Sequence, residues 1–576
     1  MSKTISYLKY TIKEVILAPL FKMLEVIFEL CVPLIVSLIV DNGINGEKGI
    51  SYVLMMCGVL VLFAILGFLS AVVAQYFSAK AAVKLSTNVR NELYKKIQSL
   101  QYSSLDEVGA STLITRMTSD VNQIQVGVNM FLRLLLRSPV VVIGAVIVAF
   151  TISSKIGLIF LLTVPTLFII VFLIMYFTIP LYAKSQQKLD RVVELSRENL
   201  NGVRVIRAFN KQENEVKTFK KENNIYTKKQ LFVSRISSLM NPLTYALINL
   251  FIIALIYFSG KEVYKGDLSQ GNVIALYNLI SQILVETIKF ASLIITVSKS
   301  FASIKRVDAI LNMESPIDLN NHTDKESSSF IEFRNVSMNY ASSNKNSLSN
   351  ISFTVNKGER VGIIGSTGSG KTTLINVLNH FYDINQGCVY LDGRDIRSYS
   401  LSEIHSRISL VPQKAQLFKG TIRDNLLWGN KNATNEDLNR AIKYAQAEDV
   451  IKKKKNGLDE EVEQNGSNFS GGQKQRLCIA RALVKKADIL ILDDSSSALD
   501  YATDAKLRIG LKEFNPNLTT FIISQRTASI MSLDKILVLD NGVLVGNGTH
   551  EELLKNCQVY QEIHYSQFSK EGDDHE

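Results

Sequence analysis

The sequence contains few cysteines and lacks the pattern of a cleaved N-terminal leader. Its five cysteines, among 576 residues, are scattered without the spacing of a metal site or a dense disulfide framework. We expect them to be small hydrophobic residues in a reducing compartment. The chain does not open on a short apolar core followed by a small-residue cleavage site, so no removable signal peptide is predicted.

What the first half does contain is a series of long apolar runs. They lie near residues 16–40, 52–78, 130–151, 156–182, 236–259 and 272–297. Each has about 20 residues or more, which suffices to cross a hydrocarbon core of ~30 Å as a helix. The runs predict six membrane spans, with both ends of the region on the same side.

The distribution of lysine and arginine indicates which side that is. The short connections at 41–51, 152–155 and 260–271 carry few basic residues, whereas the connection at 184–235 carries many. The positive-inside rule therefore predicts that the long connections and both termini are cytosolic, in a protein of the cytoplasmic membrane. Topology then accounts for much of the net charge of +11, and no nucleic-acid partner is expected.

The two long connections contain almost no helix breakers. Residues 183–240 include one glycine and no proline, and residues 79–128 include two glycines. We expect the membrane helices to continue into the cytosol, by about 30 Å for every twenty residues. A flexible cytosolic loop is the alternative.

The rest of the chain suggests further boundaries. Residues 1–15 predict a short amphipathic helix on the inner membrane surface, ahead of a transmembrane domain at 16–310. Residues 311–329 are polar and indicate a linker. Strands alternate with helices over 330–567, which is typical of an α/β domain, and 568–576 is an acidic tail that we expect to be disordered.

A glycine-rich loop follows a short β-branched run at 361–364. Residues 365–372 fit G-x-x-x-x-G-K-[ST] between a predicted strand and a predicted helix, which is the context that this phosphate-binding motif requires. Glycines let backbone N–H groups point into one cradle, and the helix N-terminus adds partial positive charge. Lys371 is expected to reach the terminal phosphates and Thr372 to bind Mg²⁺. The predicted ATP-binding residues here are Gly365, Ser366, Thr367, Gly368, Ser369, Gly370, Lys371, Thr372 and Thr373.

Two aspartates follow a second apolar run. Residues 489–492 predict a buried parallel strand, and Asp493 and Asp494 stand at its end. In α/β folds such a strand end lies where the ligand binds. Asp493 is the expected Mg²⁺ partner, and Asp494 is the candidate that orients or deprotonates the attacking water. Two turn-forming aspartates without catalytic function are the alternative.

The segment at 469–473 closely resembles the signature loop of ABC transporters; its residues are Phe469, Ser470, Gly471, Gly472 and Gln473. The order of phosphate loop, Gln413, signature loop, acidic strand and Asp500 also fits this family, and the likeness covers essentially the whole chain. It implies an α-helical transmembrane domain of six spans with long cytosolic helical extensions, followed by an α/β P-loop ATPase domain. ATP and Mg²⁺ are the implied cofactors. The resemblance also implies that Gln413 contacts Mg²⁺ and that Tyr340 stacks on adenine, unless Tyr340 is an ordinary strand aromatic.

In this family two ATPase domains meet head to tail, so that each ATP lies between one chain's phosphate loop and the other chain's signature loop. The resemblance therefore implies a half-transporter of the exporter class that needs a second half-transporter as its partner. Residues 109–120 and 198–209 match the coupling regions that rest on the ATPase domains in the family. Exposed helix turns without that role are the alternative.

Two positions depart from the family's pattern, and both belong to the site on this chain's own phosphate loop. Asp494 replaces the usual glutamate, which withdraws the carboxylate by about one C–C bond, and misplacement near 1 Å can cost about a hundredfold in rate. Gln525 replaces the usual histidine; it can hydrogen-bond a phosphate but cannot become a cation. The chain thus resembles the degenerate-site subunit of heterodimeric bacterial multidrug exporters. A homodimer that uses Asp494 as a weak base is the alternative.

Charged residues inside predicted spans are costly and usually face a cavity or a partner. Glu25 and Glu29 share one helical face of the first span, and Glu286 lies in the sixth. We interpret these three as a possible substrate cavity that would suit cationic amphiphiles, with internal pairing as the alternative for Glu25 and Glu29. Arg133 and Arg137, near the cytosolic side, are expected to snorkel.

These inferences predict ATP-driven export of amphipathic compounds, either drugs or lipids, by alternating access. The expected partners are a second half-transporter, membrane lipid and a small amphipathic substrate. A homodimeric lipid or peptide exporter and an ATP-gated, channel-like protein are the alternatives. Six spans exclude a soluble ATPase of nucleic-acid machinery.

Overall fold

The computed structural model describes residues 2–313, 327–340, 346–495 and 497–568. Its contacts divide the chain into two compact units, one of residues 1–98 and 111–313, the other of residues 99–110 and 314–576. Most of the predicted linker at 311–329 and nearly all of the predicted tail at 568–576 lie outside the described residues.

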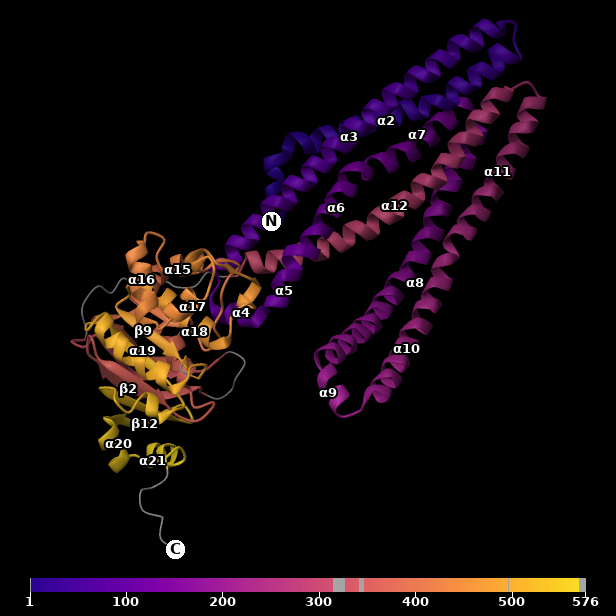
Figure 1. The fold of residues 1–576 in the computed structure, drawn as a ribbon. Helices are drawn as coiled ribbons and strands as arrows, with labels where there is room; N and C mark the ends of the chain where they lie inside the picture. The colour runs from indigo at the N-terminus through magenta and orange to yellow at the C-terminus, as the bar shows by residue number, and fades with distance from the viewer. Residues whose placement is uncertain (1, 314–326, 341–345, 496, 569–576) are drawn as a thin grey trace. The chain divides into compact units, whose positions relative to one another are not determined.

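The first unit consists of helices (Figure 1). They are α1 (Lys3–Ser6), η1 (Tyr7–Thr11), α2 (Ile12–Leu38), η2 (Ile39–Ile44), α3 (Gly49–Ser99), α5 (Ala110–Thr115), η3 (Arg116–Asp120), α6 (Val121–Leu134), α7 (Arg137–Ile152), α8 (Ser154–Asn201), α9 (Val203–Ala208), α10 (Gln212–Ser238), α11 (Met240–Tyr264) and α12 (Gln270–Leu311). Among the described residues, six continuous helical stretches are long and apolar enough to cross a membrane. Each predicted apolar run lies inside one of them, which confirms the six spans.

The long connections are helical rather than flexible. Helix α8 has 48 residues, about 70 Å at 1.5 Å per residue, which is more than twice the hydrocarbon thickness. It stops at Gly202, and α9 and α10 lead back to α11, so that the chain forms a long hairpin (Figure 1). The predicted helical extensions are therefore present.

Helix α12 is the central helix of this unit. It packs against α2, α6 and α7, and also contacts α8 and α11. Large apolar side chains are exposed along α3, α8 and α11, for example Phe68, Phe172 and Leu250. Exposed apolar faces of this length suit contact with lipid rather than water.

The N-terminal segment, predicted as one amphipathic helix at 1–15, is two short helices followed by the start of α2. It is tied to the end of α12. Lys3 Nζ donates to the carbonyl of Leu311 at 2.9 Å, and Thr4 Oγ1 donates to Asp308 Oδ1 at 2.7 Å. Polar bonds to another helix, and not only an apolar face, therefore position this segment.

The second unit is an α/β domain. Its strands are β1 (Ile331–Met338), β2 (Leu348–Val355), β3 (Arg360–Ile364), β4 (Gln386–Leu391), β5 (Arg394–Asp395), β6 (Ile408–Val411), β7 (Gly420–Thr421), β8 (Glu461–Val462), β9 (Ile489–Asp493), β10 (Thr519–Ile523), β11 (Lys535–Asp540) and β12 (Val543–Gly548). Its α-helices are α4 (Tyr102–Val108), α13 (Lys371–Leu378), α14 (Leu401–Arg407), α15 (Ile422–Leu427), α16 (Asn435–Tyr444), α17 (Glu448–Lys452), α18 (Gly471–Val484), α19 (Tyr501–Phe514), α20 (His550–Asn556) and α21 (Gln558–Tyr565). Short 3-10 helices are η4 (Ile396–Ser398), η5 (Gly457–Asp459), η6 (Gln464–Gly466) and η7 (Thr527–Ser529).

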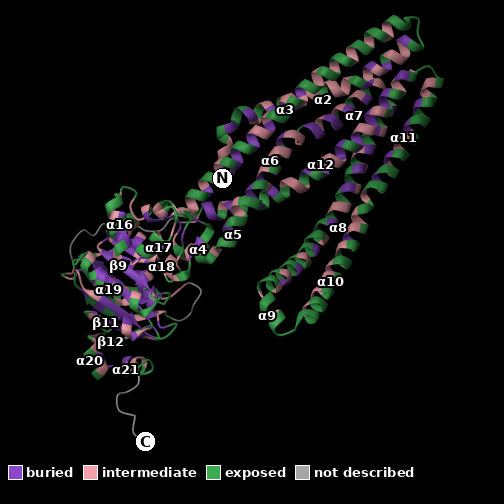
Figure 2. Ribbon diagram, in the orientation of Figure 1, coloured by how far each residue is buried: buried purple, intermediate pink, exposed green. Residues whose placement is uncertain are grey.

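The larger sheet has the order β12-β11-β3-β10-β9-β6, in which β11, β3, β10, β9 and β6 are parallel. Its five parallel strands read as continuous apolar runs because both faces are buried, one against α15, α16, α18 and α19, the other against α13 and a second sheet, and buried residues concentrate there (Figure 2). A four-stranded sheet, β2-β1-β4-β5, adds a second layer. Since the carboxyl ends of parallel strands meet at one edge, the segments that follow β3, β10, β9 and β6 are neighbours.

All five cysteines are free thiols. Cys478 and Cys557 are buried, as expected of small hydrophobic residues, whereas Cys57 is exposed on α3. In a helix that faces lipid, an exposed apolar residue of this kind is as well accommodated as a buried one.

Candidate functional site

The phosphate-binding motif has the predicted context, since residues 365–370 connect β3 to α13. Gly370 forms the N-cap of α13 with a positive φ of 100°. A Cβ at this position would lie 2.8 Å from the carbonyl oxygen of Ser347. Glycine is therefore required here by both backbone conformation and space.

The ammonium of Lys371 is folded back into this loop. Lys371 Nζ donates to the carbonyls of Gly365 at 2.9 Å and Ser366 at 2.6 Å. The side chain is 9% exposed, and burial lowers its pKa, an effect that the charges of Asp494 and Asp493 oppose. The loop thus holds a cation at the N-terminus of a helix, which is a favourable place for phosphate.

Strand β9 is buried along its length and parallel to both neighbours, as predicted. Asp493 at its end is 8% exposed, and burial, followed by the charge of Asp494, raises its pKa. Asp494 turns away with a positive φ of 46°, while its N–H donates to the carbonyl of Ile523 at 3.0 Å. Two adjacent carboxylates, one of them disfavoured as an anion by burial, fit a divalent cation.

The strand order brings the glutamines to the same edge. Gln413 follows β6, and its Nε2 donates to Asp494 Oδ2 at 3.3 Å. Gln525 follows β10; its side chain is exposed, and its segment continues from Ile523, which bonds Asp494. The Thr372 hydroxyl, the Gln413 amide oxygen and the Asp493 carboxylate offer only oxygen donors, the set that Mg²⁺ prefers.

Tyr340 lies beside the phosphate loop. Its hydroxyl donates to Thr373 Oγ1 at 3.2 Å and accepts from Asn376 Nδ2 at 3.4 Å. Its ring meets Tyr382 edge to face, with centroids 5.0 Å apart. These contacts orient the ring next to α13, where a base attached to bound phosphates would lie.

The resembled signature loop begins α18. Ser470 and Gln473 form a reciprocal capping box, with bonds of 3.3 Å and 3.0 Å. Phe469 is buried in the hydrophobic core that α15, α16 and α18 share with the larger sheet. Gly471 and Gly472 open the helix, and a Cβ on Gly472 would meet the carbonyl of Ala498 at 2.9 Å. None of the contacts described for this loop involves residues 365–373. Asp500 caps α19 by accepting from Thr503 N at 2.7 Å.

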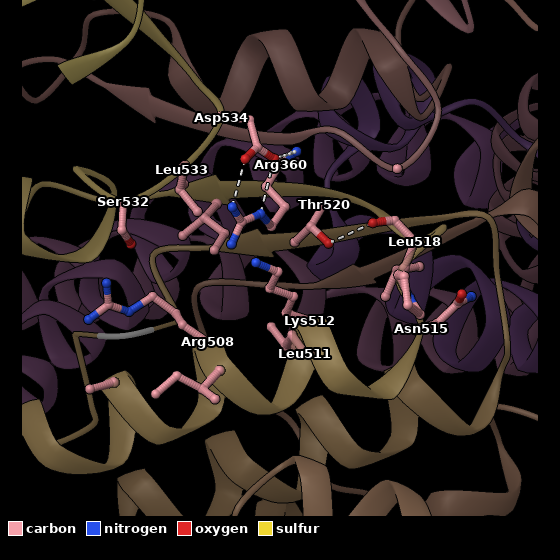
Figure 3. A pocket seen from close by; sticks show the side chains of 15 residues that line it. Arg360, Arg508, Leu511, Lys512, Asn515, Leu518, Thr520, Ser532, Leu533 and Asp534 are labelled. Atoms are coloured by element: carbon pink, nitrogen blue, oxygen red, sulfur yellow. Dashed lines mark hydrogen bonds and ion pairs between the residues drawn. The ribbon is translucent and has the colours of Figure 1, made fainter. Parts of the chain in front are cut away.

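A different surface of this unit carries a pocket of about 690 Å³ at the opposite edge of the sheet (Figure 3). It lies between α19 and the beginnings of β3 and β10. Arg360 is engaged there by Asp534, through bonds of 3.0 Å and 2.6 Å. The pocket contains none of the predicted site residues.

Helix α4 belongs by its contacts to the ATPase unit, although α3 and α5 of the membrane unit flank it in sequence. The Tyr102 ring packs against that of Phe381 at an angle of 31°, with centroids 4.4 Å apart, and the Tyr382 hydroxyl donates to the Asp106 carboxylate. The residues that belong to the ATPase unit, 99–110, overlap the expected coupling region at 109–120 at its beginning. The docked helix lies just before it, and Asp120 is held in the membrane unit by Ser303 at 2.9 Å and by Arg306.

Within the membrane unit, Arg137 joins the predicted acidic residues. It pairs with Glu25, with Glu29 at 2.9 Å and with Glu286 at 3.4 Å. Lys22 pairs with Glu25 at 2.6 Å and Lys289 with Glu286 at 2.8 Å, so three cations face three carboxylates. Arg137 is 8% exposed, so the expectation that it snorkels is wrong: neutralisation by the glutamates is the stronger interaction. For Glu25 and Glu29, the structure has the alternative considered above, pairing with a cation inside the membrane unit.

Two cavities adjoin α12. A polar one of about 460 Å³ is lined by Glu29, Glu286 and Lys289, together with Asn278, Ser281 and Gln282. An apolar one of about 710 Å³ lies between α8 and α12; its lining includes Phe168, Phe172, Tyr176, Phe177 and Phe290, and one cation, Lys184. The second was not predicted, because its residues read from the sequence as ordinary span residues.

Comparison with known proteins agrees with this architecture. Residues 15–287 match the ABC transporter transmembrane region and residues 348–497 match the ABC transporter domain. The ABC transporter ATP-binding protein YfiB of Bacillus subtilis is 33% identical over 572 residues, 99% of each chain. An export ATP-binding/permease protein of Rickettsia felis is 30% identical, covering 97% of this chain and 98% of its own.

A solved structure of a bacterial Atm1-family ABC exporter with ATP bound has the same fold, with a TM-score of 0.82 and 22% identity, covering 97% of this chain and 99% of that one. The predicted fold class, six membrane helices followed by an α/β ATPase domain, is confirmed. The chain belongs to the ABC transporter family, as a multi-pass membrane protein of the exporter type that binds nucleotide and couples ATP hydrolysis to transport.

Proposed function

We propose that this chain is the degenerate-site half of a heterodimeric ABC exporter that moves amphipathic compounds out of the cell by alternating access. The observation that carries the proposal is that both departures from the family pattern, Asp494 and Gln525, lie at the sheet edge that holds Lys371. The signature loop at 469–473, which would serve the other site, keeps the family's residues.

In this proposal residues 365–373 hold the phosphates of ATP, Lys371 leaves the carbonyls of Gly365 and Ser366 for the terminal phosphates, and Tyr340 stacks on adenine. Thr372, Gln413 and Asp493 hold Mg²⁺, which neutralises phosphate charge when bound. The raised pKa of Asp493 supports this role, because a nearby cation would favour the carboxylate.

Asp494 and Gln525 are the proposed catalytic residues. The Asp494 carboxylate would orient the attacking water and accept its proton, while Gln525 would hydrogen-bond the γ-phosphate. Gln413 already holds Asp494 Oδ2 at 3.3 Å, which keeps the shorter carboxylate at the strand end. Hydrolysis at this site is therefore slow, and ATP remains bound for long periods.

The partner is a second half-transporter in the same bilayer. Its signature loop would cover ATP on Lys371, while Ser470–Gln473 of this chain, with Asp500, covers the partner's ATP. The pairing of a degenerate site with a competent one predicts that the partner has glutamate and histidine at the two positions where this chain departs.

Both termini of the chain are proposed to be cytosolic. The substrate path is proposed to lie along α12. The apolar cavity at α8 and α12 suits the apolar part of an amphipathic substrate, and the polar cavity at Glu29 and Glu286 suits its polar part. Because the three carboxylates of that region are matched by three cations, the cluster gives no general preference for cationic substrates.

Purification of this chain alone and together with its partner tests the proposal. Alone, the chain should bind ATP and hydrolyse it slowly. With the partner, proteoliposomes should accumulate an amphipathic dye against its gradient, at the expense of ATP. Substrate-stimulated ATPase activity in the chain alone would instead establish the homodimer, and flux only down the gradient would establish a channel-like protein.

A further inference from the structure

A glutamine near the end of the described chain holds the segment that carries Gln525. Gln567 follows α21, and its side-chain amide makes three hydrogen bonds. Its Oε1 accepts from the Thr527 N–H at 2.9 Å and from Thr527 Oγ1 at 3.1 Å, and its Nε2 donates to the carbonyl of Gln525 at 2.7 Å. One amide thus fixes the backbone on both sides of Arg526.

Gln525 lies just after β10 and before the short 3-10 helix η7 (Thr527–Ser529), so neither element includes it. Strand β10 ends at Ile523, and the hydrogen bond described for Gln525 involves its carbonyl, not its side chain. The origin of the Gln525 side chain is therefore set by a backbone that two side chains hold: Gln567, and the buried Ser524, whose hydroxyl accepts from the Arg526 N–H at 2.9 Å. That backbone lies beside Asp494, because Ile523 accepts from the Asp494 N–H.

We propose that Gln567 is a positioning residue, which holds Gln525 at the distance from which it can bond the γ-phosphate. The inference rests on the proposed role of Gln525. Glutamine suits the position because a single planar amide both donates and accepts; glutamate accepts only, and asparagine is one methylene shorter.

The far side of the segment has separate anchors on α19. Arg508 Nη1 donates to the carbonyl of Ala528 at 3.0 Å, and Ser529 Oγ donates to Asp504 Oδ2 at 3.0 Å. Loss of the Gln567 amide would therefore remove its anchors from Gln525 and Thr527, while Ser524 still accepts from the Arg526 N–H at 2.9 Å and residues 528–529 stay in place. A local shift of about 1 Å is enough to weaken a contact that depends on orientation.

The experiment measures the affinity of the full-length chain, in its assembled transporter, for a non-hydrolysable ATP analogue and for ADP. Gln567→Ala should lower the affinity for the analogue by about fivefold and change the affinity for ADP by less than about twofold, because only the analogue has a γ-phosphate for Gln525 to bond. Gln567→Glu, which keeps the two bonds to Thr527, should give an intermediate ratio. Gln561→Ala is the matched control: Gln561 lies on α21, its side-chain amide donates to the carbonyl of Leu554 on α20 at 2.8 Å, and its loss should leave both affinities unchanged.

A double-variant cycle with Gln525→Ala decides whether Gln567 acts through Gln525. If it does, the double variant Gln525→Ala with Gln567→Ala binds the analogue no more weakly than Gln525→Ala alone. Additive losses, or an unchanged ratio of the two affinities in Gln567→Ala, would overturn the inference. If Gln567→Ala binds no ADP, it has not folded, and Gln567→Glu then decides by the same ratio. An unchanged ratio in Gln525→Ala would refute the proposed role of Gln525 itself, which separates the two failures.

Discussion

Asp494 adopts a backbone conformation that most side chains avoid. Its φ of 46° lies in the left-handed region, where aspartate and asparagine are several-fold enriched over other residues. Glutamate, the residue usual in the family, has one more methylene and lacks that local tolerance. At position 494, aspartate fits the turn but has the shorter side chain, whereas glutamate would extend further but strain the turn.

We predict that Asp494→Glu raises ATP turnover at this chain's own site. The longer side chain extends the carboxylate by about 1 Å toward the attacking water, and correcting a misplacement of that size can raise the rate up to about a hundredfold. The strain should cost roughly 1 kcal/mol of stability. Asp494→Asn, which keeps the turn but has no base, should lose the residual turnover. Equal ATPase rates for wild type and Asp494→Glu would show that carboxylate length is not the defect.

Nucleotide affinity should depend on pH through Lys371. Burial lowers its pKa from the usual 10.5, so between that lowered value and 10.5 the unfolded chain binds more protons than the folded one, and the contribution of Lys371 to stability rises with pH. Bound phosphate favours the ammonium, so ADP affinity should fall, with proton uptake, as pH rises through the same window. Calorimetry in buffers of different ionisation enthalpy measures this. Lys371→Met should bind weakly, without the proton uptake.

The site residues that could be predicted from the sequence are those that lie close together along the chain. The phosphate loop at 365–372 and the aspartates after β9 are contiguous motifs, and parallel strands necessarily bring them to one edge. Gln567 is 42 residues from Gln525, and Glu25 is 112 residues from Arg137. Neither periodicity nor spacing in the sequence predicts such pairs, because the two residues meet only when the helices and strands pack.

At the scale of secondary-structure elements, the chain ties three membrane helices together through one arginine. Arg137 begins α7, and its glutamate partners stand on α2 and α12. The helix packing was not predictable from hydropathy, because apolar runs indicate where a helix crosses but not which face meets its neighbour. The same limit applies to α4 (Tyr102–Val108), whose packing against Phe381 and Tyr382 no motif in the sequence indicated.

We predict that Arg137→Gln destabilises the membrane unit by about 3 kcal/mol or more, because it leaves buried carboxylates without their shared partner. Arg137→Gln with Glu286→Gln should recover part of the loss. Arg133→Gln is the control, since the buried Nε of Arg133 has no hydrogen-bond partner among the described residues. Thermal unfolding in detergent measures all three. Equal losses from Arg133→Gln and Arg137→Gln would contradict a specific role for the cluster.

At the scale of the whole molecule, the chain must transmit a change at the nucleotide to its membrane helices. Helix α4 is suited to this, because it packs within the ATPase unit while peptide bonds connect it to α3 and α5. Tyr382 joins two functions: its hydroxyl bonds Asp106 of α4, and its ring meets Tyr340 beside the phosphate loop. Burial and the bond to Asp106 raise the pKa of Tyr382, so the phenol remains protonated and continues to donate at any physiological pH.

Removal of that hydroxyl should therefore uncouple transport from hydrolysis without unfolding the site. Tyr382→Phe keeps the ring contact with Tyr340 but removes the donor to the Asp106 carboxylate. Because that carboxylate is exposed and water can replace the donor, the loss at α4 is about 1 kcal/mol. We expect basal ATPase activity to be retained, and both substrate stimulation and dye accumulation in proteoliposomes to fall by about fivefold. Tyr399→Phe is the matched control, because its hydroxyl bonds the carbonyl of Leu391 at 2.8 Å, within the ATPase unit. If Tyr382→Phe lowers basal hydrolysis and transport in equal proportion, the residue supports the nucleotide site rather than the transmission, and α4 is then coupled through Tyr102 and Phe381 instead.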